Sequence, residues 1–272
     1  MVKKLLKYEF IYYLRTFGAF LPIVLVIGAV TKLFLFLEEQ YGGKVIEIAS
    51  GSSVFMLVVA CFALLLLPTV VGIVRFYKNM YSSEGYLTFT LPVTNAQHIF
   101  VKLLGVLGCY LFCALTVIAS ASIAMAGNTL GNVIADIVGV IKGMAVVLGS
   151  INVTFICIEM LILLILSMCS NMLLYYSCIT IGQTAKKNRI LAAVGVYFAY
   201  YIITQVISTV FSIVFIVGGT LGAFEDIALW IAENYIASIH LIMCGGIVLS
   251  CAIAALFWLI NQTIMKKKLN LE

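Results

Sequence analysis

Few residues in this sequence could do chemistry, and the clearest candidate is an isolated acid. Glu159 is the one acidic residue deep inside a long apolar stretch of the chain. Burying a charge there is costly, so an ionisable residue is a functional candidate that could contact a substrate or a proton in a polar cavity. The alternative is a structural carboxyl, held by a hydrogen bond near the outer end of its span. We favour the structural role and keep Glu159 as a candidate for a substrate path.

The histidines and cysteines form neither a catalytic nor a metal-binding motif. His98 and His240 are far apart in the sequence, and no nucleophile or set of metal ligands surrounds either of them. Cys109 and Cys113 share a helix face, but without a nearby histidine they do not indicate a zinc site. All eight cysteines lie inside or at the edges of apolar stretches, which is typical of packing and not of a disulfide framework. We therefore expect no metal site.

Nucleotide chemistry is not indicated either. The sequence lacks the GxxxxGK[ST] loop whose backbone amides cradle nucleotide phosphates. We therefore expect no ATPase site, no cofactor and no enzyme activity in this chain.

The composition is that of an integral membrane protein. Hydrophobic residues make up 64% of the 272 residues and charged residues only 10%, and the mean hydropathy is +1.19. A helix needs about 20 apolar residues to cross a hydrocarbon core about 30 Å thick, and continuous apolar runs favour helices over barrel strands. Six stretches are long enough, near residues 17–37, 54–74, 102–126, 153–180, 191–219 and 238–262. We expect an all-α integral membrane protein with six transmembrane helices, forming one domain over residues 1–272.

The charges are distributed unevenly between the two sides of this arrangement. Lys and Arg residues in short loops resist translocation and so mark the cytoplasmic side. Thirteen of the 16 basic residues fall on one side, and seven of the 11 acidic residues fall on the other. Both termini are then cytoplasmic. The net charge of +5 reflects this topology, so we expect no nucleic-acid partner.

The N-terminal residues, 1–16, are predicted to form an interfacial helix. On a helical wheel Lys3, Lys4, Lys7 and Arg15 lie on one side and apolar residues on the other, although Glu9 and Ile11 break the pattern. Such a helix lies in the headgroup layer with its basic side chains toward anionic lipid, which makes membrane lipid a partner. The alternative is a frayed, basic tail.

Two further segments stay open. Residues 127–150 are mildly apolar and rich in glycine, and they suit an interfacial helix on the outer face. A full span there would put Lys186, Lys187 and Arg189 outside, which the charge distribution opposes. Residues 218–237 carry three glycines, three acids and Trp230, and they suit either a re-entrant segment or a solvated loop. Between residues 102 and 126, the small residues near the end of the span predict close helix packing.

A polar and aromatic segment, residues 76–101, connects the second and third spans on the cytoplasmic side. Gly85 permits a bend, Leu91-Pro92 favours an extended residue, and Thr94 to Gln97 fit a capping box that begins a helix. A structured corner here would expose Tyr81 and other aromatic side chains beside an acid. Because exposing them without a partner is unfavourable, we expect a docking surface for another protein.

This segment resembles a known family. Residues 75–93, RFYKNMYSSEGYLTFTLPV, look like the first cytoplasmic loop of ABC-2-type ABC transporter permeases of Gram-positive bacteria. The N-terminal helix, the six spans, the cytoplasmic termini and the second short loop at 181–190 agree with that family. The resemblance covers the whole topology, but its specific motif covers only residues 75–93.

The resemblance implies a permease subunit that pairs with a separate ABC ATP-binding subunit, on which ATP and Mg²⁺ bind. Two permeases, either identical copies or paralogues, would join two ATPases. Residues 76–101 would be the coupling loop and would enter a groove of the ATPase. The implied contact residues there are Glu84, Gly85, Tyr86 and Leu87, with Lys186, Lys187 and Arg189 as a second, weaker contact.

We therefore expect the transmembrane permease of an ATP-driven transporter in the bacterial cytoplasmic membrane. An apolar pathway with few charges suits a lipid-like substrate or an amphipathic peptide, including efflux of membrane-active peptides. The alternative is a non-transporting interaction protein, such as an immunity or sensor subunit. An ion-driven secondary transporter predicts an inverted repeat and paired intramembrane charges, neither of which is evident in the sequence. The substrate and the direction of transport stay open.

Overall fold

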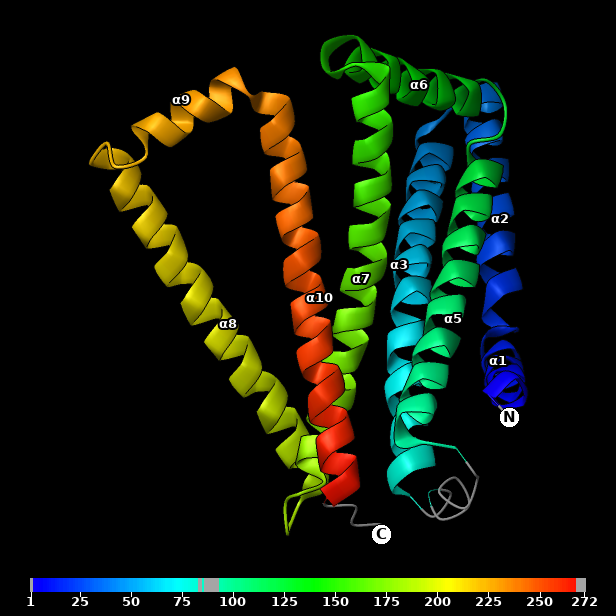
Figure 1. Cartoon of the computed structure of the whole chain (residues 1–272). Helices are drawn as coiled ribbons and strands as arrows, with labels where there is room; N and C mark the ends of the chain where they lie inside the picture. The colour runs from blue at the N-terminus through cyan, green and yellow to red at the C-terminus, as the bar shows by residue number, and fades with distance from the viewer. Residues whose placement is uncertain (1, 83–84, 86–92, 268–272) are drawn as a thin grey trace. The chain divides into compact units, whose positions relative to one another are not determined.

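The computed structural model describes residues 2–82, 85 and 93–267. Glu84, Tyr86 and Leu87 of the predicted coupling loop lie outside the described residues. The described residues form helices and no strand (Figure 1), so the predicted all-α fold is confirmed. The helices are α1 (Val2–Phe17), α2 (Phe20–Tyr41), α3 (Lys44–Tyr81), α5 (Asn95–Ala124), α6 (Asn128–Leu148), α7 (Ser150–Gly182), α8 (Arg189–Thr220), α9 (Glu225–Glu233) and α10 (Tyr235–Lys267).

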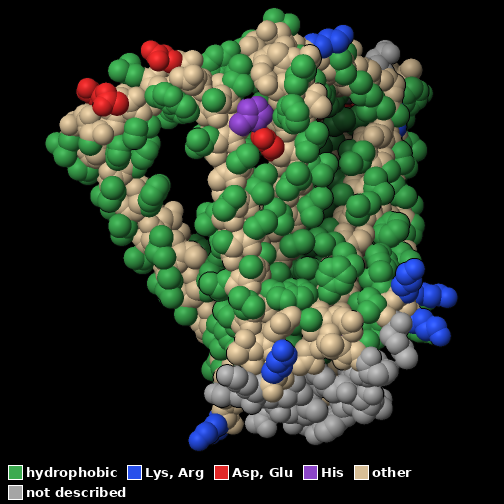
Figure 2. Space-filling model, viewed as in Figure 1, with side chains coloured by type: hydrophobic (Ala, Val, Ile, Leu, Met, Phe, Trp, Pro, Cys, Tyr) green, Lys and Arg blue, Asp and Glu red, His purple; other side chains and the backbone are tan. Residues whose placement is uncertain are grey.

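Seven helical stretches among the described residues are long and apolar enough to cross a membrane. Six of them, in α2, α3, α5, α7, α8 and α10, overlap the six spans expected from the sequence. The seventh is Leu130–Leu148 of α6, which lies in the segment expected to be interfacial. On the face that Figure 2 shows, hydrophobic side chains cover the sides of the long helices, and most of the visible charged side chains lie near helix ends. The chain is a multi-pass membrane protein.

The helices extend beyond the predicted spans. α3 has 38 residues where residues 54–74 were predicted, and at about 1.5 Å per residue it is much longer than a hydrocarbon core about 30 Å thick. It includes Pro68 without ending there. Because α3 continues to Tyr81 and α5 begins at Asn95, helices cover both ends of the segment 76–101.

The chain divides into two compact units. The first comprises Met1–Met80 and Tyr86–Ile141, and the second comprises Tyr81–Gly85 and Lys142–Glu272. The first therefore contains α1, α2, nearly all of α3, α5 and the greater part of α6. The second contains α7, α8, α9 and α10.

In the first unit, α2, α3 and α5 pack around a core that includes Val24, Leu64 and Cys113. A Cβ atom at Gly28 of α2 would lie only 2.8 Å from the backbone oxygen of Ser120 in α5, so these two helices approach as closely as a glycine allows. Ser120 belongs to the small-residue run near the end of α5. Ser120 therefore has the packing role that was predicted for that run.

α1 packs against the glycine face of α5. A Cβ atom at Gly105 would lie 2.9 Å from the Tyr13 ring, and one at Gly108 would lie 2.3 Å from the Phe10 ring. Tyr13 is fully buried in this contact. Two glycines in α5 thus create the surface that the aromatic side chains of α1 occupy.

α6 differs in direction from α2, α3 and α5, the long helices of the first unit (Figure 1). It lies across the ends of α2, α3 and α5 that are distant from α1, and does not run alongside them (Figure 1). A helix in this orientation can lie along a membrane surface although its length and composition would also permit a crossing.

In the second unit, α7 and α10 pack along one another, whereas α8 diverges from α7 beyond their connection (Figure 1). The close approach occurs at Gly182, where a Cβ atom would lie 2.7 Å from the backbone nitrogen of Ala193. α8 has no buried residue. The segment 218–237 forms a turn and the short helix α9, which begins with Glu225 and Asp226 and leads into α10.

Candidate functional site

The predicted coupling loop connects α3 to α5, and α5 begins as the sequence indicates. Thr94 Oγ1 accepts a hydrogen bond from the Gln97 backbone N–H at 3.4 Å, and Gln97 Oε1 accepts one from the Thr94 backbone N–H at 3.1 Å. This reciprocal pair is a capping box, which satisfies amides that have no partner inside the helix. The predicted start of a helix at this position is confirmed.

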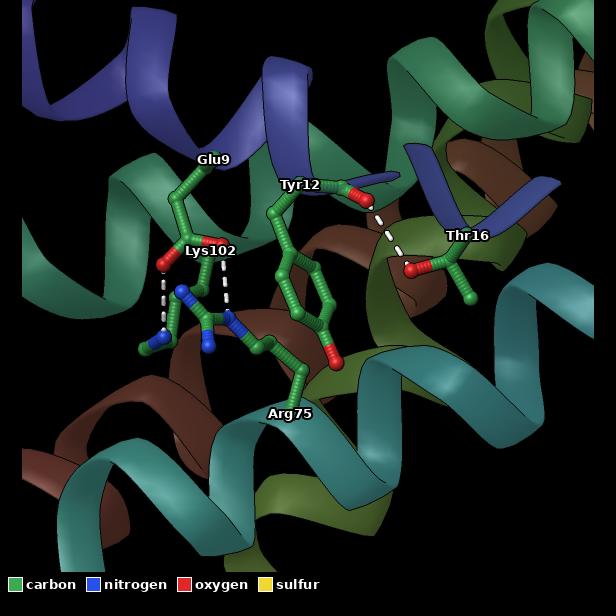
Figure 3. Close-up of polar contacts among 5 residues, drawn as sticks. All are labelled: Glu9, Tyr12, Thr16, Arg75 and Lys102. Carbon is green, nitrogen blue, oxygen red and sulfur yellow. Dashed lines mark hydrogen bonds and ion pairs between the residues drawn. The ribbon is translucent and has the colours of Figure 1, made fainter. Parts of the chain in front are cut away.

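A buried carboxylate joins three helices of the first unit. Glu9 of α1 is 5% exposed. The Nζ of Lys102 in α5 lies 2.8 Å from its Oε1, and the Nε of Arg75 in α3 lies 3.5 Å from its Oε2 (Figure 3). The guanidinium of Arg75 also lies over the Tyr12 ring, 3.8 Å from the ring centroid. We call Glu9, Tyr12, Arg75 and Lys102 the Glu9 cluster.

The Glu9 cluster explains why Glu9 departs from the amphipathic pattern of the N-terminal helix. A carboxylate away from water is stable only with charged or hydrogen-bonding partners, and removing one partner of a buried pair is strongly destabilising. Lys3, Lys4, Lys7 and Arg15 are all exposed, so the basic face of α1 is as predicted. Glu9 lies on the other face, where it holds α1 against α3 and α5. The predicted N-terminal helix is present, and the frayed-tail alternative is not.

Tyr81 lies in the second unit and is buried, which corrects the expectation of an exposed side chain. It is 2% exposed, and its hydroxyl donates a hydrogen bond to Thr180 Oγ1 at 3.0 Å. Thr180 in turn donates to Asn261 Oδ1 at 2.8 Å, and Asn261 Nδ2 donates to Ser177 Oγ at 2.9 Å. These hydrogen bonds join α7 and α10 to the last residue of α3. Packing removes the Tyr81 ring from any docking surface.

The other predicted contact residues lie in two short segments. Gly85 is buried, and its N–H donates to the Ser82 carbonyl at 2.7 Å. Lys186 and Lys187 are exposed in the turn between α7 and α8, which ends at Asn188 in a left-handed conformation (φ 55°). Arg189 begins α8 and is half-buried.

Glu159 of α7 is paired with His240 of α10. The His240 Nδ1 lies 2.9 Å and 3.0 Å from the two carboxylate oxygens, and the side chains of Glu159 and His240 are 18% and 25% exposed. Cys244 Sγ is 4.0 Å from Glu159 Oε1. Within the described ranges, however, no three His, Cys, Asp or Glu side chains are grouped to hold a metal ion. The pair is therefore a polar link between two apolar helices.

Sequence reasoning missed the partners of Glu9, Glu159 and Tyr81. The Glu159 pair could have been found, since Glu159 and His240 both lie a short distance inside the outer ends of two predicted spans. The sequence indicated the Glu9 cluster and the Asn261 hydrogen bonds less clearly, because neighbouring residues in the sequence do not show which helices will pack together.

The fold and these contacts define a class, that of all-helical, multi-pass membrane proteins with buried polar links between helices. No family model matches the chain, and no curated protein or solved structure matches it either. The connection to ABC-2-type permeases consequently stands on the resemblance of residues 75–93.

Proposed function

We propose that the chain is the permease subunit of an ATP-driven transporter of the ABC-2 type, located in the bacterial cytoplasmic membrane. The Glu9 cluster is the observation that best supports it. The helices that lead into and out of the proposed coupling loop, α3 and α5, are both joined to α1 by charged contacts with the buried Glu9 carboxylate. A partner that moved the loop would therefore move these three helices together.

The proposed topology has six crossings with both termini in the cytoplasm. Two observations support it. The basic residues gather on one side of a six-span arrangement, and α6 lies across the ends of its neighbours (Figure 1). A crossing by α6 would reverse the orientation of the second unit and place Lys186, Lys187 and Arg189 outside.

The proposed ATPase contact comprises Glu84, Gly85, Tyr86 and Leu87, with Lys186, Lys187 and Arg189 as a secondary contact. In this proposal Tyr81 anchors the loop and does not touch the partner, because its ring is buried against Thr180. The partner binds ATP and Mg²⁺, and a second permease completes the assembly. The substrate of the assembled transporter is a lipid-like molecule or an amphipathic peptide, in keeping with the apolar surfaces of the spans.

Affinity purification from native membranes tests this function. The wild-type chain should retain an ATP-binding protein, and Glu84→Lys should retain about tenfold less, because losing a central contact of an interface commonly costs more than 1 kcal/mol. Glu47→Lys is the matched control, since it makes the same charge change at the first turn of α3, distant from the loop.

Both variants must insert into the membrane at wild-type levels for the comparison to hold. If the wild-type chain retains no ATP-binding protein, the permease function is wrong, and a non-transporting interaction or immunity subunit becomes the better assignment.

A further inference from the structure

The first unit contains an apolar groove between α2, α3 and α5. Its volume is about 610 Å³, and side chains of all three helices line it, including Leu57, Phe62, Leu65, Val117 and Ala121. The α3 side is open, since Val58 and Phe62 are 61% and 65% exposed. The groove is therefore accessible from the membrane and not sealed within the unit.

The groove has the length of one membrane leaflet. Along α3 it extends from Val54 to Leu65, which is eleven residue steps of about 1.5 Å, or about 16 Å. Half of a hydrocarbon core about 30 Å thick is about 15 Å. A single acyl chain aligned with α3 would thus be covered from its headgroup to the middle of the bilayer.

Two opposite charges lie at one end of the groove. Lys32 and Glu39 of α2 both line it, and neither forms a salt bridge with another described residue. A Cβ atom at Gly127 would lie 3.7 Å from Lys32 Nζ, so the ammonium lies beside the turn between α5 and α6. Glu39 follows Lys32 by seven residues, two turns or about 10 Å nearer the end of α2. Along the groove, toward the C-terminal end of α2, the order is apolar surface, ammonium, carboxylate.

We propose that this groove binds one phospholipid of the surrounding bilayer whose headgroup carries a primary amine. The acyl chain occupies the apolar groove, the phosphate contacts Lys32, and the amine contacts Glu39. Such a lipid has the complementary order of groups: acyl chain, phosphate, ammonium. A glycerol headgroup offers Glu39 no positive charge, and a choline headgroup offers it no N–H donor. The proposal does not depend on an ATPase partner, because the groove lies within the isolated chain.

Native mass spectrometry of the purified full-length chain tests the proposal. The probes are palmitoyl-oleoyl phosphatidylethanolamine, phosphatidylglycerol and phosphatidylcholine, supplied at equal concentrations. The wild-type chain should retain one phosphatidylethanolamine in preference to the other two lipids, by roughly tenfold. Lys32→Gln should reduce the retention of all three lipids. Glu39→Gln should abolish the preference for phosphatidylethanolamine over phosphatidylglycerol while leaving a lipid bound.

Matched controls separate the groove from general effects on the helices. Lys44→Gln and Glu47→Gln remove the same charges from exposed positions at the same end of the unit, and both should behave like the wild-type chain. Ala121→Phe fills the groove and should reduce retention, whereas Ala119→Phe adds the same ring at an exposed position of α5 and should not.

Equal retention of the three lipids by the wild-type chain would overturn the proposal, and so would unchanged selectivity in Glu39→Gln. A dimer that retains no lipid would assign the groove to a second copy of the chain and would also overturn it. Because Glu39→Gln changes an exposed side chain, its result does not depend on whether Ala121→Phe folds.

Discussion

Glu9 and Lys102 form an ion pair that is almost fully removed from solvent, with Glu9 5% and Lys102 2% exposed. Charges in such surroundings are weakly screened, so their partners determine whether the helices carrying them can stay together. Arg75 adds the third helix to the same carboxylate. At the scale of residues, this carboxylate is the link between the N-terminal helix and the helices on either side of the proposed coupling loop.

Neutralising this carboxylate is predicted to destabilise the first unit. Glu9→Gln should lower the free energy of unfolding by about 3 kcal/mol, because a buried ammonium loses its nearest anion. Chemical denaturation in detergent micelles measures the change, and trypsin sensitivity at Lys7 and Arg15 reports the release of α1. Glu47→Gln, at an exposed position of α3, should change stability by less than about 0.5 kcal/mol. A Glu9→Gln variant as stable as the parent would show that the Glu9 cluster does not hold α1.

The Glu159–His240 pair is predicted to be structural. Glu159→Gln keeps an oxygen that can accept from the His240 N–H, so its stability should lie within about 0.5 kcal/mol of the wild type. Glu159→Leu removes the acceptor and should cost about 1–2 kcal/mol. Denaturation of both variants measures this difference. Loss of transport in a stable Glu159→Gln variant would contradict the structural role and would make the carboxylate part of the substrate path.

At the scale of elements, α6 is the helix whose relation to the membrane matters most for the topology. Its length and composition permit a crossing, whereas its orientation across the ends of α2, α3 and α5 (Figure 1) also permits it to lie along a membrane surface. If it lies there, both of its ends are on the same side of the membrane.

Cysteine labelling is predicted to show that both ends of α6 are on the same side of the membrane. In a background lacking the eight native cysteines, single cysteines replace Ala126 and Ser150, which flank α6. A membrane-impermeant maleimide applied to intact cells should label both positions. Labelling of one position alone would mean that α6 crosses the membrane, which would reverse the orientation of every later helix. The background chain is checked first for membrane insertion and helix content.

The sequence predicted the positions of helices where these depend on residues close together in the chain. Long apolar runs predicted six helices that the structure contains, and the capping box at Thr94 to Gln97 was recognisable because its two partners are three residues apart. α3 was predicted too short, since its polar ends continue the helix beyond the apolar run that hydropathy detects. The burial of Tyr81 was missed because its hydrogen-bond partner, Thr180, is 99 residues away. In the sequence, Glu9 appeared only as an interruption of the amphipathic pattern of the N-terminal helix. Its structural role depends on the packing of α1 against α5.

At the scale of the whole molecule, the chain separates into two compact units, and the proposed coupling loop contains their junction at Met80 and Tyr81. The first unit holds the Glu9 cluster, and the second holds the Tyr81, Thr180 and Asn261 hydrogen bonds. A partner bound to this loop would therefore act on anchored segments in both units. This arrangement is what ATP-driven switching between two helix packings would require.

Site-specific photo-crosslinking tests the proposed coupling most directly. Benzoylphenylalanine is placed at position 86 in the loop or at position 36, where the native phenylalanine of α2 is 51% exposed. If the chain is a permease driven by a separate ATPase, ultraviolet irradiation of native membranes will join position 86, and not position 36, to an ATP-binding protein identified by mass spectrometry. Correctly inserted chains that yield no such adduct at position 86, or the same adduct at position 36, would contradict it.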